Sequence, residues 1–543
     1  MWWYLQRKFT SSSGSDFPTK NSRQILSWVI VEPVVPSSLL KKENGLSSST
    51  TEKPKSGFSA TLDRYFEITK RGSTIGTEFR GGLVIFMTMV YIIILNPIIL
   101  AFSPDVNGNV IGGGAADAFE FAPQAIASAT ALAAGLMTIA FGLVARLPFA
   151  IAAGLGINSF LAVTLVKDVT WQEAMGLVVI DGVIILILAI TGLRTMIFTA
   201  VPAALKTAIT VGIGLFIAFI GLVDGGLVRR TDVGPVPVGL GVGTEHGIGL
   251  PTTIFIIGVL TIAVLMAMRV RAAILIGLIS TTVIAIIAEA IFKVGGKFVK
   301  GEFVTPFGWD TTIPGLPTSI FAVPDFSTIG QVSLFGSFER IGALAAIMLV
   351  FTLVFSNFFD AMGTMTGLSK QAGLADKDGN FPRLKSALVV EGAGAVVGGF
   401  TSTSSNTVYI ESASGIAGGA RTGLANVVTG VLFLVAMFFA PLTSVVPIEV
   451  GASALVIVGA LMMSQVVDID WKDWSISFPA FLTIIMMPFT YSIANGIGIG
   501  FITWVVIRAF AGKGKEIHPI LWIVAAGFVL YFVSAPLTAA LGG

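Results

Sequence analysis

From residue 81 to the C-terminus, the chain alternates long apolar runs with short polar connections. A helix that spans a bilayer needs about 20 mostly apolar residues. Such runs lie near 81–103, 125–146, 149–166, 174–193, 199–222, 251–268, 272–292, 341–363, 385–398, 400–418, 423–441, 450–467, 475–510 and 518–539. The pattern predicts about 14 transmembrane segments, and the run at 475–510 is long enough to bend or split.

The amino-terminal region differs from the rest of the chain. Residues 1–60 are rich in Ser, Thr, Lys and Pro and have no helical period, so we expect a mostly disordered tail. Residues 61–80 read as an amphipathic, juxtamembrane lead-in. We therefore predict a transmembrane domain over 81–540, with 81–292 and 341–540 as its two repeats.

Composition supports a membrane protein and narrows its chemistry. The chain is 54% hydrophobic and 12% charged, whereas soluble domains carry about 25% charged residues. With net charge +2 and no basic, aromatic-interleaved patch, we expect no nucleic-acid partner. The chain has no Cys and two His, so we expect no metal site, no cofactor and no enzyme. The longest loops, 223–250 and 293–340, are too short for the output domain of a sensor.

Basic residues concentrate in alternate loops, which is typical of the cytoplasmic side of a membrane. This set comprises Lys70, Arg71, Arg80, Arg146, Arg194, Lys206, Arg269, Arg271, Lys370, Lys377, Arg383 and Lys385. The opposite loops carry Asp105, Asp117, Glu120, Asp224 and Asp232. We expect a multi-pass protein of the plasma membrane with a cytoplasmic amino terminus, in contact with membrane lipid.

Two segments are too polar or too rich in glycine for plain lipid-facing helices. They are Ala152–Ser159 in the third segment and Thr401–Ser412 in the tenth. With 14 segments, three and ten hold the same place in two halves of seven, and paired broken segments favour a transport site at mid-membrane. Gly, Ser and Thr favour an extended stretch followed by a half-helix, whose first N–H groups face a cavity. Close helix packing through small residues is the alternative.

Carboxylates inside apolar runs are costly and need a reason. Asp360 ends an apolar run and Glu411 follows the Ser/Thr stretch, so both are candidates for substrate binding and proton coupling. A carboxylate can accept N–H bonds from one edge of a heterocycle and can exchange a proton. The alternatives are a capping role for Asp360 and a structural hydrogen bond for Glu411. Asp181 lies mid-segment and could tune proton transfer or be a core acid whose hydrogen bonds are satisfied. For Glu391 we expect a role in fixing helix packing.

Several long motifs, in order, resemble those of one transporter family. They are Met87–Pro97, Leu147–Ala150 leading to Asn158–Phe160, Gly212–Ala218, Phe359–Thr364, Tyr409–Ala413 and Gly418–Leu424. Over about residues 61–540 the chain resembles the AzgA-type purine permeases of the nucleobase–cation symporter-2 (nucleobase/ascorbate transporter) family. Relatives often have Pro at position 153, where this chain has Ala, and a second acid at position 357, where it has Asn.

The resemblance implies an all-α polytopic fold: a 7+7 inverted repeat with core and gate domains, and short strands in segments three and ten. It implies uptake of adenine, guanine or hypoxanthine by proton symport, and dimers formed through the gate. It also assigns Asn158, Asp360 and Glu411 to the site.

The residues themselves add the backbone near Gly156, Asn406 and Thr407 as donors to the solute. H⁺ is the expected coupling ion, with Na⁺ left open. Another nucleobase, uracil or xanthine, or a small anion on the same fold is the alternative substrate, although neither odd segment contains the Arg or Lys that would suit an anion.

Overall fold

The structure is a computed structural model. It describes residues 57–540, except 117–120, 231–237, 242–248, 300–301, 306, 318 and 376–380. The tail predicted over residues 1–60 lies outside the described residues up to 56. The lead-in is a short helix, α1 (Phe58–Phe66), with Phe66 buried, and the first spanning helix begins at Ile75.

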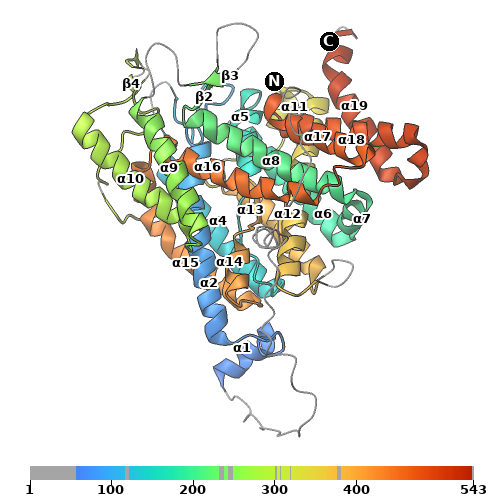
Figure 1. The fold of residues 1–543 in the computed structure, drawn as a ribbon, viewed down its shortest axis with the longest axis horizontal. Coiled ribbons are helices and arrows are strands. Elements are labelled where there is room, and N and C mark those ends of the chain that lie inside the picture. The colour runs from blue at the N-terminus through green and yellow to red at the C-terminus, as the bar shows by residue number, and fades with distance from the viewer. Residues whose placement is uncertain are drawn as a thin grey trace, which may run out of the picture. The chain divides into compact units, whose positions relative to one another are not determined.

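The first half of the membrane domain consists of long helices and one broken segment, β1 followed by α5 (Figure 1). Its elements are α2 (Ile75–Met89), α3 (Ile92–Leu100), α4 (Pro123–Val144), β1 (Ile151–Ala153), α5 (Leu155–Val163), η2 (Leu165–Lys167), α6 (Trp171–Thr191), α7 (Leu193–Ala200), α8 (Ala203–Asp224), α9 (Leu250–Ala267) and α10 (Ala273–Phe292). Two small hairpins follow α8 and α10; they are β2 (Val228–Arg230) with β3 (Val238–Leu240), and β4 (Phe298–Val299) with β5 (Glu302–Phe303).

The second half repeats this order after the short helix α11 (Gly336–Arg340). Its elements are α12 (Ala343–Gln371), α13 (Leu384–Phe400), β6 (Asn406–Val408), α14 (Ser412–Ala417), α15 (Gly423–Ala436), η3 (Met437–Val445), α16 (Ile448–Met463), η4 (Ser464–Asp468), α17 (Trp474–Phe489), α18 (Ile493–Arg508), η5 (Ala509–Lys513), η6 (Gly514–Glu516) and α19 (Pro519–Ala540). The run at 475–510 is thus two helices, α17 and α18, which meet at a turn after Phe489.

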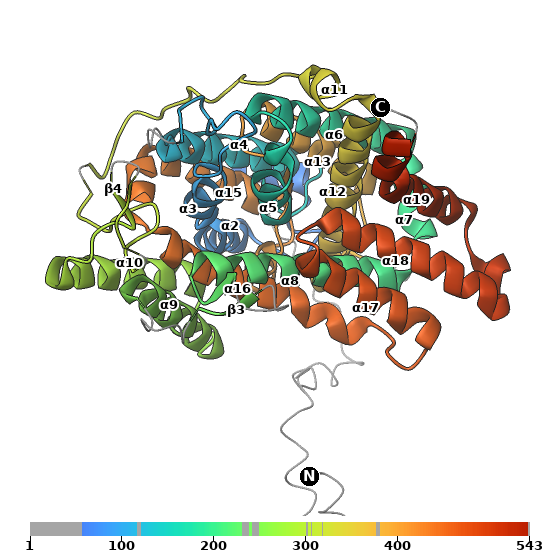
Figure 2. The same ribbon diagram turned by 90° about the horizontal axis from the view of Figure 1, so that it is seen from above.

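The helices sort into two groups that correspond to the expected core and gate. In the core, α4 packs against α15, α6 against α13, and α2 against α14. In the gate, α8 packs against α16 and α17, and α16 packs against α9. Figure 2 shows α8, α9, α16, α17 and α18 along one side and α4, α5, α6, α12 and α13 on the other.

The packing of the gate is symmetrical between the halves. The contact of α8 with α17 has its counterpart in α16 with α9, and the pair α17–α18 has its counterpart in α9–α10. The helix α19 packs against α18 and α7, outside this symmetrical set. Strands β1 and β6 pair antiparallel, as expected when the two halves run in opposite directions.

Among the described residues, ten helical stretches are long and apolar enough to cross a membrane. The predicted segments three and ten are not among them, because each is a short strand followed by a half-helix. Segment nine, α13, has 17 residues. Arg194, predicted in a cytoplasmic loop, is instead fully buried and pairs with Glu391 of α13, so it gives no orientation signal.

Candidate functional site

The two broken segments meet at the centre of the core. We call residues 150–154 the first unwound segment and residues 401–411 the second. Strand β1 of the first pairs with β6 of the second, with Ala152 opposite Thr407, and both strands are buried. The ladder continues into the flanks, because Gly154 N–H donates to the Ser405 carbonyl at 2.9 Å and Tyr409 N–H donates to the Ala150 carbonyl at 3.0 Å.

A two-stranded ladder leaves backbone groups on its outer edges that need partners in a membrane. Core side chains supply several of them. Thr138 of α4 accepts from Ile151 N–H at 3.0 Å and donates to the Ile151 carbonyl at 2.8 Å. The hydroxyl of Ser412 accepts from Ala150 N–H at 3.0 Å. The strand pair is therefore a braced element of the core, and non-helical backbone is tolerated there because it is enclosed by protein.

The half-helix α5 starts directly after this ladder. The first N–H groups of a helix have no intrahelical acceptor, so Leu155, Gly156 and Ile157 present donors at the start of α5. Gly156 also marks a close approach to the gate: a Cβ there would stand 2.7 Å from the Cγ2 atom of Ile213 on α8. The site therefore lies where core and gate meet.

Asn158 is fully buried one turn into α5. Its amide nitrogen donates to the Asn96 side-chain carbonyl of α3 at 2.5 Å. Asn96 in turn donates to the Thr130 hydroxyl at 2.8 Å and to the Thr403 carbonyl at 3.2 Å. The side-chain carbonyl oxygen of Asn158 is buried and has no partner within the described part of the chain.

The two candidate acids reach the strand pair from different helices. Asp360 lies on α12 with its carboxyl group beside the Thr407 hydroxyl, close enough to Glu411 for the two charges to interact. Glu411 immediately precedes α14 and accepts a hydrogen bond of 2.5 Å from the Tyr91 hydroxyl, at the break between α2 and α3. Both acids are only partly buried. The arrangement places two carboxyl groups by the strand that pairs with β1, and α5 starts directly after β1.

Asn406 and Thr407 occupy different positions with respect to the acids. The Asn406 side chain donates to the Gly394 carbonyl of α13 at 3.1 Å, so it anchors β6 to the core. The Thr407 side chain lies by Asp360 instead. The structure thus brings Gly156, Asn158, Asp360, Thr407 and Glu411 to one region, with Asn406 contributing backbone to it.

Three further polar side chains belong to this region although the sequence did not single them out as site residues. They are Tyr91, which holds Glu411; Tyr409, whose hydroxyl donates to the Ala153 carbonyl at 2.5 Å; and Asn96. A buried Tyr in a membrane helix is itself a signal, because its hydroxyl needs a partner. Asn96 entered the sequence analysis only as part of the motif Met87–Pro97.

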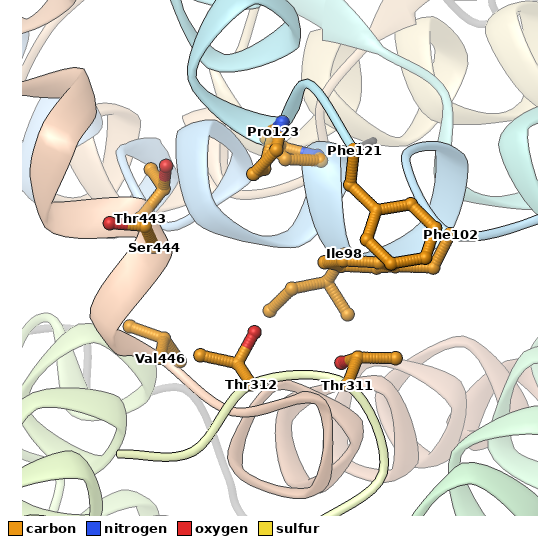
Figure 3. Close-up of a pocket in the computed structure, with 10 residues that line it drawn as sticks. Ile98, Phe102, Phe121, Pro123, Thr311, Thr312, Thr443, Ser444 and Val446 are labelled. Atoms are coloured by element: carbon orange, nitrogen blue, oxygen red, sulfur yellow. The ribbon is translucent and has the colours of Figure 1, made fainter. Parts of the chain in front are cut away.

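A cavity of about 210 Å³ lies at the end of α3, between core and gate (Figure 3). Its lining includes Pro97, next to Asn96, and Val446 just before α16. Phe102 and Phe121 pack edge to face beside it with ring centroids 4.9 Å apart. None of the six predicted site residues lines this cavity, so it is separate from the carboxylates in this conformation.

The paired broken segments, the core and gate and the buried polar strand pair define a multi-pass membrane transporter with two related halves. A family model described as "Permease family" matches residues 76–499. The chain belongs to this family of permeases, and it is a transporter and not an enzyme.

Two curated relatives illustrate the similarity. The guanine/hypoxanthine permease PbuG of Bacillus subtilis (strain 168) is 38% identical over 476 residues, covering 87% of this chain and 99% of the relative. The adenine permease AdeQ of Escherichia coli (strain K12) is 36% identical over 478 residues, covering 88% of this chain and 97% of the relative.

Solved structures show the same fold at low identity. The transmembrane domain of a cyanobacterial bicarbonate transporter, BicA, has a TM-score of 0.53 at 14% identity and covers 78% of this chain and 97% of its own. The murine anion transporter Slc26a9, in an inward-facing state, has a TM-score of 0.52 at 12% identity. The match covers 87% of this chain and 74% of the Slc26a9 chain. The predicted 7+7 inverted-repeat fold is confirmed, with short strands in segments three and ten.

Proposed function

We propose that this protein imports purine bases, namely adenine, guanine or hypoxanthine, together with protons. This chain matches relatives named as purine permeases over almost the whole length of those relatives. The observation that carries the proposal is the placement of Asp360 and Glu411, from two different elements, beside the strand pair where α5 begins. A purine presents N–H donors along one edge and ring nitrogens along others, which suits carboxylates on one side and free N–H groups on the other.

Recognition would divide between the two halves. Asp360 and Glu411 accept hydrogen bonds from the N–H edge of the base. The N–H groups at the start of α5, near Gly156, and the Asn158 carbonyl oxygen meet its remaining polar atoms. The backbone near Asn406 and Thr407 supports the same face. Hydrogen bonds to charged groups contribute about 1.5–3 kcal/mol each, so the two acids dominate this site.

Transport would follow from movement of the core against the gate. The contact between Gly156 and α8 places the site at the boundary of these two groups, where a rocking motion opens it to either side. Asp360 and Glu411 are the candidates to bind the coupling proton. We further propose location in the plasma membrane with a cytoplasmic amino terminus, on the basis of the basic residues in alternate loops.

Uptake measurements in whole cells test the proposal. Cells that express the protein are expected to accumulate labelled adenine, guanine or hypoxanthine, and a protonophore is expected to remove most of this accumulation. Accumulation that depends on Na⁺ and resists the protonophore would contradict proton symport. Competition by uracil or bicarbonate, without competition by any of the three purines, would contradict the substrate class.

A further inference from the structure

One of the fully buried carboxyl groups of the core, that of Asp181, is not among the proposed substrate-site residues. Asp181 lies in the middle of α6 and is fully buried. Its Oδ2 atom accepts from the amide nitrogen of Asn357 on α12 at 3.2 Å. Its Oδ1 atom has no hydrogen-bond partner among the residues that the structure describes. A buried carboxylate in this state is costly unless something compensates its charge.

The charged groups around Asp181 do not compensate it one for one. Glu391 of α13 and Arg194 of α7 are the charges that reach it. Arg194 is fully buried in an ion pair with Glu391, so its positive charge is already matched. At the first turn of α6, Arg340 of α11 pairs with Glu173 and not with Asp181, while Asp360 of α12 lies by Thr407. One positive charge therefore serves two buried acids.

The partner of Asp181 is also incompletely bonded. The Asn357 amide nitrogen donates to Asp181 and, at 2.7 Å, to the Ser405 hydroxyl. The Asn357 carbonyl oxygen is buried and has no partner in the described chain. An ionised carboxyl group only accepts hydrogen bonds, whereas a protonated one also donates. A proton on Asp181 therefore adds the donor that this acid–amide pair lacks and removes the uncompensated charge.

We propose that Asp181 is a proton-holding group of the transport cycle and that Asn357 relays its state to the second unwound segment. Deprotonated Asp181 only accepts, from one N–H of the Asn357 amide, whereas protonated Asp181 also donates, and the acceptor beside it is the unbonded Asn357 carbonyl oxygen. Ser405 directly precedes β6, so a change in the Asn357–Ser405 bond acts on the strand that carries Thr407. Asp181 touches neither Asp360 nor Glu411 in the described contacts, which makes it a positioning residue for the site.

This inference rests on the proposed proton symport, so the experiment must separate the two. Purified full-length protein is reconstituted into liposomes that contain a pH-sensitive dye. Equimolar labelled adenine and hypoxanthine serve as the substrate. Two quantities are measured: acidification of the lumen driven by the base, and exchange of labelled for unlabelled base at equal pH on both sides, which needs no net proton movement.

For Asp181→Asn, the rate of base exchange is expected to stay within about 3-fold of the wild-type rate. The rate of lumen acidification is expected to fall at least about 10-fold. The double variant Asp181→Asn/Asn357→Asp contains the same two groups in exchanged positions, and acidification should return in it. Glu339→Gln, an exposed acid on α11, is the matched control and should leave both quantities unchanged.

Each remaining outcome decides between the two proposals. Wild-type protein that exchanges base without acidifying the lumen would contradict proton symport itself. If wild-type protein and Asp181→Asn acidify the lumen at the same rate, the role of Asp181 is overturned and proton symport stands. A double variant that exchanges base but does not acidify also counts against it. If neither variant reconstitutes in a folded form, Asp181 is a structural acid and the inference is wrong.

Discussion

The two unwound segments form the two strands of one ladder from different residues. The first, residues 150–154, has the sequence Ala-Ile-Ala-Ala-Gly. Its outer backbone groups form hydrogen bonds with the side chains of Thr138 and Ser412. The second, residues 401–411, begins with seven Ser, Thr and Asn residues and ends in Val, Tyr, Ile and Glu. Its backbone takes left-handed φ values of 56° at Ser402 and 73° at Ser404.

This difference indicates a division of labour between the halves. The first segment has no ionisable side chain and contributes backbone geometry, together with Asn158 one turn further on. The second segment ends in Glu411 and lies next to Asp360, so it supplies the acids. A repeat that has kept its fold can thus place structure in one copy and chemistry in the other. The predictions below test this division.

The largest effect is expected from removing the acid of the second segment. Glu411→Gln loses the charge that accepts from Tyr91 and, in the proposal above, from the base. Two hydrogen bonds to a charged group at about 1.5–3 kcal/mol each correspond to a loss of about 100-fold or more in uptake. Initial rates of labelled hypoxanthine uptake, normalised to protein in the membrane, measure it. Wild-type uptake by Glu411→Gln would show that the second segment does not carry the chemistry.

A smaller effect, on stability, is expected where the second segment crosses α13. A Cβ at Gly398 would stand 1.9 Å from the Ser404 carbonyl oxygen and 3.0 Å from Asn406 N. Gly398→Ala therefore forces the left-handed backbone at Ser404 to shift, and overpacking of this kind costs about 1–3 kcal/mol. Thermal unfolding of the purified protein should move to lower temperature.

Gly367→Ala on α12 is the matched control for Gly398→Ala. A Cβ at Gly367 meets nothing within 4 Å, and alanine is favoured over glycine inside a helix by about 1 kcal/mol. This control should leave the unfolding temperature unchanged or raise it. Equal unfolding temperatures for the two alanine variants would mean that the second segment accommodates the added methyl group without loss of stability.

The sequence predicted the breaks because local composition determines them. Gly-rich residues around Gly154 and the Ser/Thr run before Asn406 disfavour a continuous helix wherever the chain places them. Their matching positions in two halves indicated a shared site, and the structure adds that β1 and β6 pair with each other. Asp360 and Glu411 stand out in the sequence because acids within apolar runs are rare, and their role in the site stays a prediction.

The partners of these residues could not be predicted in the same way. The Tyr91 hydroxyl and Glu411 are 320 positions apart, and Arg194 and Glu391 are 197 apart. Such contacts depend on how the halves interlock, and no local pattern encodes that. Arg194 shows the resulting error in prediction. A basic residue at the end of an apolar run has the pattern of a loop residue, yet the fold buries it against an acid from the other half.

The smallest effect is expected from the residue that positions the acid. Tyr91→Phe removes the hydroxyl that donates to Glu411 and keeps the ring and the charge of Glu411. Because a water molecule can replace part of that bond, the expected loss is about 1 kcal/mol, or roughly 5- to 10-fold in the apparent affinity for the base. Concentration-dependent uptake should show a higher KM with little change in maximal rate. A loss as large as that of Glu411→Gln would instead place Tyr91 among the groups that bind the base, and the first half would then share in the chemistry.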